Sequence, residues 1–308
     1  MEIDNQSETT LPKMFDPTPF STSAATGVLV GSVIFGYIVT MLFAFAGVMY
    51  SSADTGKSVG DIILKIGLLV GTVCFIVPAY WFTRRENKSF KTVFRLNSVS
   101  LNTILFAFVL ALGLVVVTDT IDRWIAPMIN AYLDKTIGVL SPELMSDKIL
   151  EKMKEEFRLT GFLDGTLLIL AAVFAAGICE EMLLRGMFQG AFEQRMSAVW
   201  AIAISSLVFS LIHINPWGGV QIFIIAVFLG IIAWRTGSII PTIIIHAMNN
   251  LLVIIFNNIG PEKISWYGDE KHIEPWTIGV GVLFSLIGLF GLWNTSKSPH
   301  LLSAAEAP

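Results

Sequence analysis

Long apolar segments separated by shorter polar ones dominate this chain of 308 residues. Most of the apolar segments are close to the roughly 20 residues that a helix needs to cross a bilayer. Charged residues gather mainly in the connections between them. The pattern therefore predicts an all-α membrane protein, a polytopic bundle of about eight transmembrane helices. The expected spans are 26–50, 62–82, 101–118, 163–190, 198–214, 220–234, 238–259 and 276–293.

The stretch between the third and fourth spans, residues 119–162, has a different pattern. A Ser-Pro pair at 141–142 is typical of a helix start, because serine caps a helix and proline fits its first position. Further on, Leu150, Met153 and Phe157 share one helical face, and lysines and glutamates cover the others. We expect an amphipathic interfacial helix. Its role stays open between a connector on the membrane surface and a lid that gates substrate entry.

The ends of the chain are more polar than its middle. Residues 1–24 are polar, contain three prolines and predict a disordered tail. Residues 25–295 are expected to form a single transmembrane domain with a catalytic core at about 165–258, followed by a polar tail at 296–308. The densest basic cluster beside a span lies at 84–95, so the positive-inside rule places that loop in the cytoplasm. With an even number of spans, both termini are expected there too.

Composition agrees with a membrane protein and excludes other classes. Hydrophobic residues make up 54% and charged residues 14% of the chain, with a mean hydropathy of +0.70. Soluble domains carry about 25% charged residues. The chain has no basic stripe, so we expect no nucleic-acid partner. Its two cysteines both lie in apolar segments, which argues against a disulfide framework.

Two adjacent carboxylates, Glu180 and Glu181, lie in the middle of the fourth span. A charge inside a membrane costs about 3 kcal/mol on insertion scales, so each carboxylate needs a partner, a proton or water. Arg185 follows Glu181 by four residues on the same helical face, which predicts an ion pair. Glu180 points about 100° away and has no partner within its own helix. Glu180 is therefore the candidate functional group.

Polar residues in two other spans are candidates to meet Glu180. His213 lies at the end of the fifth span, and His246 and Asn250 share one face of the seventh. Because polar groups in a membrane need partners, we expect the three helices to bring these side chains together. A carboxylate and an imidazole can hold a water and take its proton. Histidine and asparagine can donate to an oxyanion that develops on a carbonyl. The set predicts a hydrolase that uses no serine, cysteine or metal.

Three short motifs resemble those of the CPBP family of intramembrane endopeptidases, which includes the type II CAAX prenyl proteases and the bacterial Abi proteins. In the family's order, they are Glu180-Glu181-x-x-x-Arg185, Phe209-x-x-x-His213 and His246-x-x-x-Asn250. All three fall on separate predicted helices, and the resemblance covers about residues 171–252. It does not extend to the first three spans or the last one.

The resemblance implies a fold of about eight membrane helices around a water-filled cavity, and an intramembrane glutamic endopeptidase. It implies that Glu180 activates a water, that His213 helps to hold this water, and that His246 and Asn250 are the oxyanion donors. The supporting residues that it implies are Glu181, Arg185 and, by packing, Phe209.

Two alternatives stay open. The first is a zinc-dependent intramembrane metalloprotease, in which Glu180, His213 and His246 are ligands and a fourth position is open. The second is a non-catalytic membrane accessory or immunity protein with the same fold. The glutamic endopeptidase, by contrast, needs no cofactor. The expected partners are the lipid bilayer and a peptide or protein substrate, with membrane-anchored and prenylated substrates among the candidates.

Overall fold

The computed structural model describes residues 19–51, 57–259, 263–269 and 272–296. Within these ranges the chain is helical and forms no strand beyond an isolated bridge between Gly268 and Ile273. The predicted all-α class is confirmed. Most residues of the predicted tails lie outside the described ranges. At the N-terminus, however, Phe20 is buried and the first helix begins at Thr22, within the stretch that was expected to be disordered.

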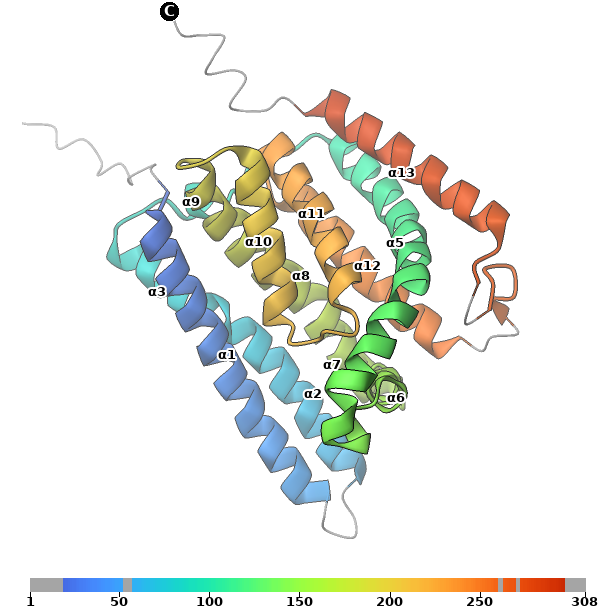
Figure 1. Cartoon of the computed structure of the whole chain (residues 1–308). Coiled ribbons are helices and arrows are strands. Elements are labelled where there is room, and N and C mark those ends of the chain that lie inside the picture. Colours follow the sequence, from blue (N-terminus) through green and yellow to red (C-terminus); the bar gives the residue numbers. More distant parts are fainter. Residues whose placement is uncertain (1–18, 52–56, 260–262, 270–271, 297–308) are drawn as a thin grey trace, which may run out of the picture.

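The helices follow one another in a bundle (Figure 1). Their bounds are α1 Thr22–Ser51, α2 Lys57–Cys74, α3 Ile76–Arg85, α4 Phe90–Val93, α5 Leu101–Thr136, α6 Ser146–Glu156, α7 Phe162–Leu168, α8 Ala176–Glu181, α9 Gln189–Glu193, α10 Ala198–Ile212, α11 Gly219–Thr236, α12 Ile240–Asn258 and α13 Pro275–Thr295. Short 3-10 turns, η1 Gly138–Leu140 and η2 Pro142–Leu144, precede α6, and π-helical segments, η3 Ile169–Ala175 and η4 Met182–Phe188, flank α8.

Seven helices within the described ranges are long and apolar enough to cross a membrane. They correspond to all the predicted spans except the fifth. That span is α10, whose 15 residues reach only about 22 Å, less than the roughly 30 Å of a hydrocarbon core. The chain is an integral membrane protein. Helix α10 is an eighth apolar helix, shorter than the seven candidate spans, and His213 follows it directly. The sides of the membrane on which the termini lie stay a prediction.

The first and last helices frame the bundle, and the helix that carries the two glutamates runs through its middle (Figure 1). Helix α1 pairs with α2, and α13 pairs with α5. The segments from α7 to α9 form one continuous helical stretch, Phe162–Glu193. This stretch is also the most buried of the candidate spans. Several of its residues are small, and small residues let helices in a membrane approach each other closely.

One of these small residues, Gly186, lies where the backbone of the glutamate helix approaches another segment most closely. A Cβ atom on Gly186 would lie 2.8 Å from the backbone of Phe94. Such a contact is too short for any larger side chain. Because Phe94 is itself fully buried, the segment after α4 is packed directly against the glutamate helix.

The amphipathic helix is present, but the predicted start at 141–142 is wrong. Pro142 opens the 3-10 turn η2, and α6 begins at Ser146. The backbone N–H and hydroxyl of Ser146 both donate to the carboxylate of Asp134, at 2.7 and 2.8 Å. A long-range partner therefore sets the start of this helix, which the local sequence could not reveal.

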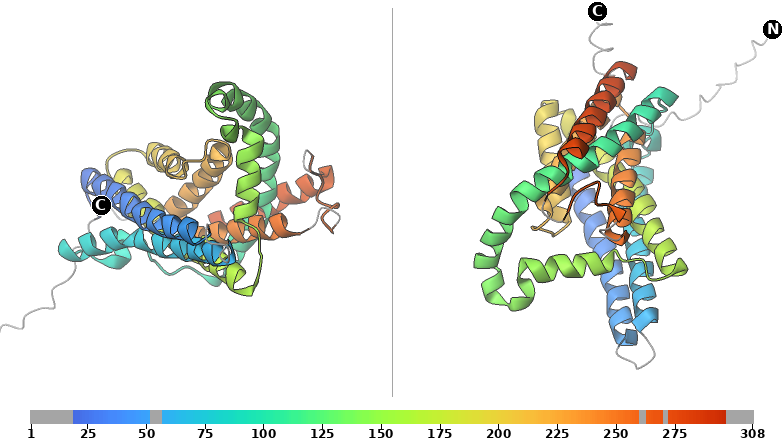
Figure 2. Two further views of the ribbon diagram at one scale, coloured as in Figure 1. Left: turned by 90° about the horizontal axis from the view of Figure 1, so that it is seen from below. Right: turned by 90° about the vertical axis from the view of Figure 1, so that its right-hand side faces the viewer.

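Helix α6 lies across the end of the bundle, at a steep angle to α5 (Figure 2). The side-chain amide of Asn257, near the end of α12, donates to the carbonyl of Lys154 at 2.8 Å. The amide of Asn215, in the turn after α10, lies 3.6 Å from the sulfur of Met153. Helix α6 thus contacts the turn that follows His213, and its predicted roles as connector or lid both stay open.

Candidate active site

One glutamate meets two histidines from other helices. Glu180 is in the last turn of α8, His213 directly follows α10, and His246 lies within α12. Oε2 of Glu180 lies 3.8 Å from Nε2 of His213 and 3.9 Å from Nε2 of His246. The structure thus brings together three of the four residues that the sequence selected as catalytic.

The cluster is open on the side of His213. The side chain of His213 is 30% exposed, that of Glu180 13% and that of His246 6%. Oε2 of Glu180 is buried and has no hydrogen-bond partner among the residues that the structure describes. Its distances to the two imidazoles are too long for direct hydrogen bonds. Contacts at such distances between polar groups can include a water.

The other nitrogen of each imidazole has a partner that fixes the ring. Nδ1 of His213 lies 2.7 Å from the carbonyl oxygen of Phe209, and Nδ1 of His246 lies 3.0 Å from Oε1 of Glu181. Carbonyl and carboxylate oxygens only accept, so each Nδ1 donates its proton. In a neutral ring, Nε2 then has a free lone pair close to Glu180. A doubly protonated ring would donate from Nε2 instead.

The predicted ion pair between Glu181 and Arg185 is present. Nη1 of Arg185 donates to Oε1 of Glu181 at 2.9 Å, and both side chains are fully buried. Nη2 of Arg185 also donates to the carbonyl of Ala226 in α11, at 3.3 Å. Because Glu181 accepts from His246 as well, the pair does more than neutralise a charge. It links the glutamate helix to α11 and to the face of α12 that carries His246.

Phe209 lies at the centre of these contacts and is 3% exposed. The guanidinium carbon of Arg185 is 4.1 Å from the centroid of its ring. The rings of His213 and His246 contact the same phenyl group, with centroids 4.6 and 5.7 Å away. Phe209 therefore supports both imidazoles by packing, and its carbonyl orients one of them.

Asn250 lies one helical turn from His246, on the same face of α12. Its amide nitrogen donates to the carbonyl of Ala172 in η3 at 2.7 Å. Its side-chain oxygen is 3.4 Å from the amide of Asn249. The bond to Ala172 joins α12 to the glutamate helix, and neither of these two contacts of Asn250 is with Glu180, His213 or His246.

Tyr37 is a residue near the site that the sequence did not single out. It lies in α1, and its hydroxyl donates to the carbonyl of Ile212, the residue before His213. Nothing in the sequence around Tyr37 forms a motif, so only the three-dimensional fold could reveal this contact.

The three cluster atoms have the chemistry of zinc ligands, but their spacing does not fit a bound ion. Tetrahedral zinc with Zn–N and Zn–O bonds of about 2.0 to 2.1 Å holds its ligand atoms about 3.3 to 3.4 Å apart. The distances from Glu180 to His213 and His246 are 3.8 and 3.9 Å. Across the described ranges, no set of three His, Cys, Asp or Glu side chains has the geometry of a metal site.

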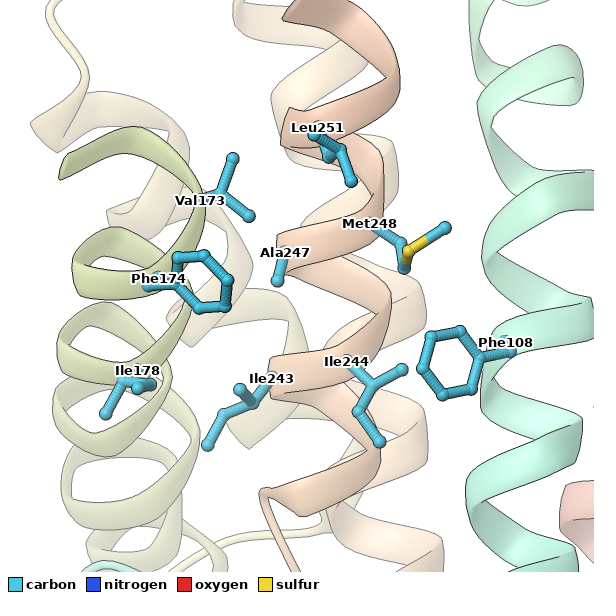
Figure 3. A pocket seen from close by; sticks show the side chains of 9 residues that line it. All are labelled: Phe108, Val173, Phe174, Ile178, Ile243, Ile244, Ala247, Met248 and Leu251. Carbon is cyan, nitrogen blue, oxygen red and sulfur yellow. The ribbon is translucent and has the colours of Figure 1, made fainter. Parts of the chain in front are cut away.

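An apolar pocket of about 270 Å³ lies nearby, between α5, α12 and the glutamate helix (Figure 3). Ile178, one of its lining residues, lies about 200° round the helix from Glu180, so the pocket is on the other side of that helix from the carboxylate. Phe174 and Ile178 are both substantially exposed, which places the pocket at the surface of the bundle. The lining residues are Phe108, Val173, Phe174, Ile178, Ile243, Ile244, Ala247, Met248 and Leu251.

The segment that carries this site is similar to a known protein family. Residues 162–252 match the family model described as type II CAAX prenyl endopeptidase Rce1-like. Searches of curated proteins and of solved structures returned no match. The matched segment contains all three motifs, the glutamate helix and most of α12. Over residues 162–252, the chain is therefore similar to the type II CAAX prenyl endopeptidase, Rce1-like family, as the motifs predicted.

Proposed function

We propose that this protein hydrolyses a peptide bond within the membrane by means of a water held between Glu180 and His213. The observation that carries the proposal is the position of Glu180 Oε2, buried and within 4 Å of two imidazole Nε2 atoms. His213 donates its Nδ1 proton to a carbonyl, so its Nε2 can accept from a water. Glu180 can take the second proton of the same water as the general base.

In this proposal His246 acts on the opposite side of the reaction. A doubly protonated His246 keeps its Nδ1 bond to Glu181 and donates from Nε2 to the oxyanion that forms on the attacked carbonyl. Glu180 and Glu181 together then balance the charges of Arg185 and of the imidazolium. Asn250 has a second amide proton beyond the one bound to Ala172, and it lies one turn away on the same face. It is the second oxyanion donor of the proposal.

Zinc remains the second candidate, for one specific reason. Both histidines donate from Nδ1 to an oxygen and leave Nε2 free, which is also the arrangement of metal-ligating histidines. A zinc site would require Glu180, His213 and His246 to move closer together. We prefer the metal-free reading because the observed distances are longer than those between the ligands of one zinc ion.

We further propose that the substrate is a membrane-anchored peptide or protein, such as one with a prenylated C-terminal motif. The description of the matched family supports a prenylated substrate. A lipid-linked substrate is held at the membrane, which favours encounter with a site buried in a helical bundle. Each CH₂ group of the anchor that leaves water contributes about 0.8 kcal/mol.

The test uses the purified full chain in lipid nanodiscs and a quenched fluorescent peptide that ends in a farnesylated CAAX sequence. The same peptide without the farnesyl group is the matched control. We expect cleavage of the farnesylated peptide, with a kcat/KM at least about tenfold higher than that of the control, because the anchor concentrates the peptide in the membrane.

Equal cleavage of both peptides would contradict the preference for an anchored substrate but keep the peptidase. A protein that cleaves neither peptide, and whose Glu180→Gln variant still supports its cellular role, would contradict the peptidase itself. The accessory protein would then be the better account.

A further inference from the structure

The short helix α10 ends at the site, and the carbonyls of its last turn have unusual partners. A helix leaves its last four carbonyls without partners of their own helix. In α10, three of these are satisfied within the turn that contains His213. The bonds are His213 Nδ1 to Phe209 at 2.7 Å, His213 N–H to Ser210 at 3.3 Å, and Ile214 N–H to Leu211 at 3.1 Å.

The fourth carbonyl, that of Ile212, is satisfied from another helix. Its partner is the hydroxyl of Tyr37 in α1. Tyr37 is half-buried, and its ring packs edge-on against Phe75, with centroids 5.7 Å apart. Its neighbour Gly36 allows α1 to approach Phe75, because a Cβ atom there would lie less than 2 Å from the ring. The position of the Tyr37 hydroxyl is therefore well defined.

The turn at the end of α10 needs such a constraint. Ile214 adopts a φ of +49°, a left-handed conformation that is rare for a β-branched residue. A residue of this kind stores about 1 to 3 kcal/mol and persists only where its surroundings hold it. The side chain of Ile214 is 75% exposed, so its own packing cannot supply the constraint. The hydrogen bonds made by backbone groups on either side of His213 must therefore hold the turn in place.

We propose that Tyr37 is a positioning residue for the hydrolysis, acting through His213. Its hydroxyl fixes the carbonyl of Ile212 and with it the last turn of α10. That turn keeps the carbonyl of Phe209 free to orient the His213 ring, whose Nε2 lies 3.8 Å from Glu180. Tyr37 lies outside residues 162–252, so α1 supplies a part of the site that the matched segment lacks. This inference rests on the catalytic role proposed for His213.

The Tyr37→Phe variant removes the hydroxyl and keeps the ring. Tyr50→Phe is the matched control, since Tyr50 lies in the same helix with an exposed side chain. Displacement of a catalytic group by about 1 Å can cost about 100-fold in rate. We expect Tyr37→Phe to lower kcat for the farnesylated peptide by about 10- to 100-fold, with KM and the midpoint of thermal unfolding unchanged. Tyr50→Phe should match the wild type.

Hydrogen–deuterium exchange gives a second readout that does not depend on activity. The backbone amides of 209–217 should exchange faster in Tyr37→Phe than in the wild type or in Tyr50→Phe. Unchanged exchange, or faster exchange with an unchanged kcat, would overturn the inference. So would a fall in thermal stability with a raised KM, which indicates general loosening. If His213→Ala keeps full turnover, the proposed function fails, independently of the exchange result.

Discussion

Replacing Glu180 with glutamine is expected to lower turnover by about 10² to 10⁴, the usual contribution of general acid–base catalysis. Glutamine keeps the shape of the side chain but cannot take a proton from a water. Oε2 of Glu180 is buried and unpaired among the described side chains, so loss of the charge should leave stability unchanged or raise it. The measurement is the kcat for the farnesylated peptide, alongside thermal unfolding in detergent.

Glu86→Gln is the control for the same chemical change, because Glu86 is exposed at the end of α3. It should have wild-type turnover. Asn250→Ala extends the test to the oxyanion and should lower kcat by about 10² to 10³. A Glu180→Gln variant with wild-type turnover would contradict the proposed base. An Asn250→Ala variant that only loses stability would show that its bond to Ala172 is its whole role.

Replacing Arg185 with alanine is expected to destabilise the protein by about 3 to 5 kcal/mol, the typical cost of breaking a buried ion pair from one side. Glu181 would keep its charge in a fully buried position without its guanidinium partner. The contact of the guanidinium with Phe209 would also be lost. The measurement is the midpoint of thermal unfolding in detergent, which should fall together with activity.

Arg235→Ala is the matched control. Arg235 also lies over an aromatic ring, that of Trp293, at 4.3 Å, but near the end of its helix and with a side chain that is only partly buried. Loss of such a surface contact costs about 0.5 to 1 kcal/mol. The double variant Arg185→Met, Glu181→Gln removes both charges and should recover much of the stability. If Arg185→Ala is as stable as the wild type and merely inactive, Arg185 acts on the substrate instead.

Helical periodicity predicted the parts of the site that depend on a single helix. The spacing of Glu181 and Arg185 predicted their ion pair, and the 100° offset of Glu180 predicted that it would need partners elsewhere. The scarcity of polar groups in the spans then indicated His213 and His246, which the structure places near Glu180.

The contacts between helices could not be predicted from the sequence, because they depend on how the helices pack against one another. The bond from His246 to Glu181 changes Glu181 from a structural partner into the residue that orients an imidazole. The bond from Asn250 to Ala172 and that from Tyr37 to Ile212 were equally invisible. None of these pairs has a sequence spacing that a helix or a motif would reveal.

The lengths of elements were the least predictable part of the fold. The third span was expected to end at residue 118, but α5 continues to Thr136 as one helix. Apolar character ends near Thr118, whereas the helix itself does not, because polar residues also form helix where tertiary contacts support it. Asp119 shows such support, since its carboxylate accepts from Arg123 one turn on and from the hydroxyl of Tyr267.

The most direct test of the central claim is the zinc content of an active preparation, measured by elemental analysis on the sample whose turnover of the farnesylated peptide is recorded. The account predicts full turnover with far less than one zinc per chain, and no loss after treatment with a chelator. One zinc per chain, lost together with activity on chelation and restored with it on addition of zinc, would contradict the metal-free water held by Glu180 and His213.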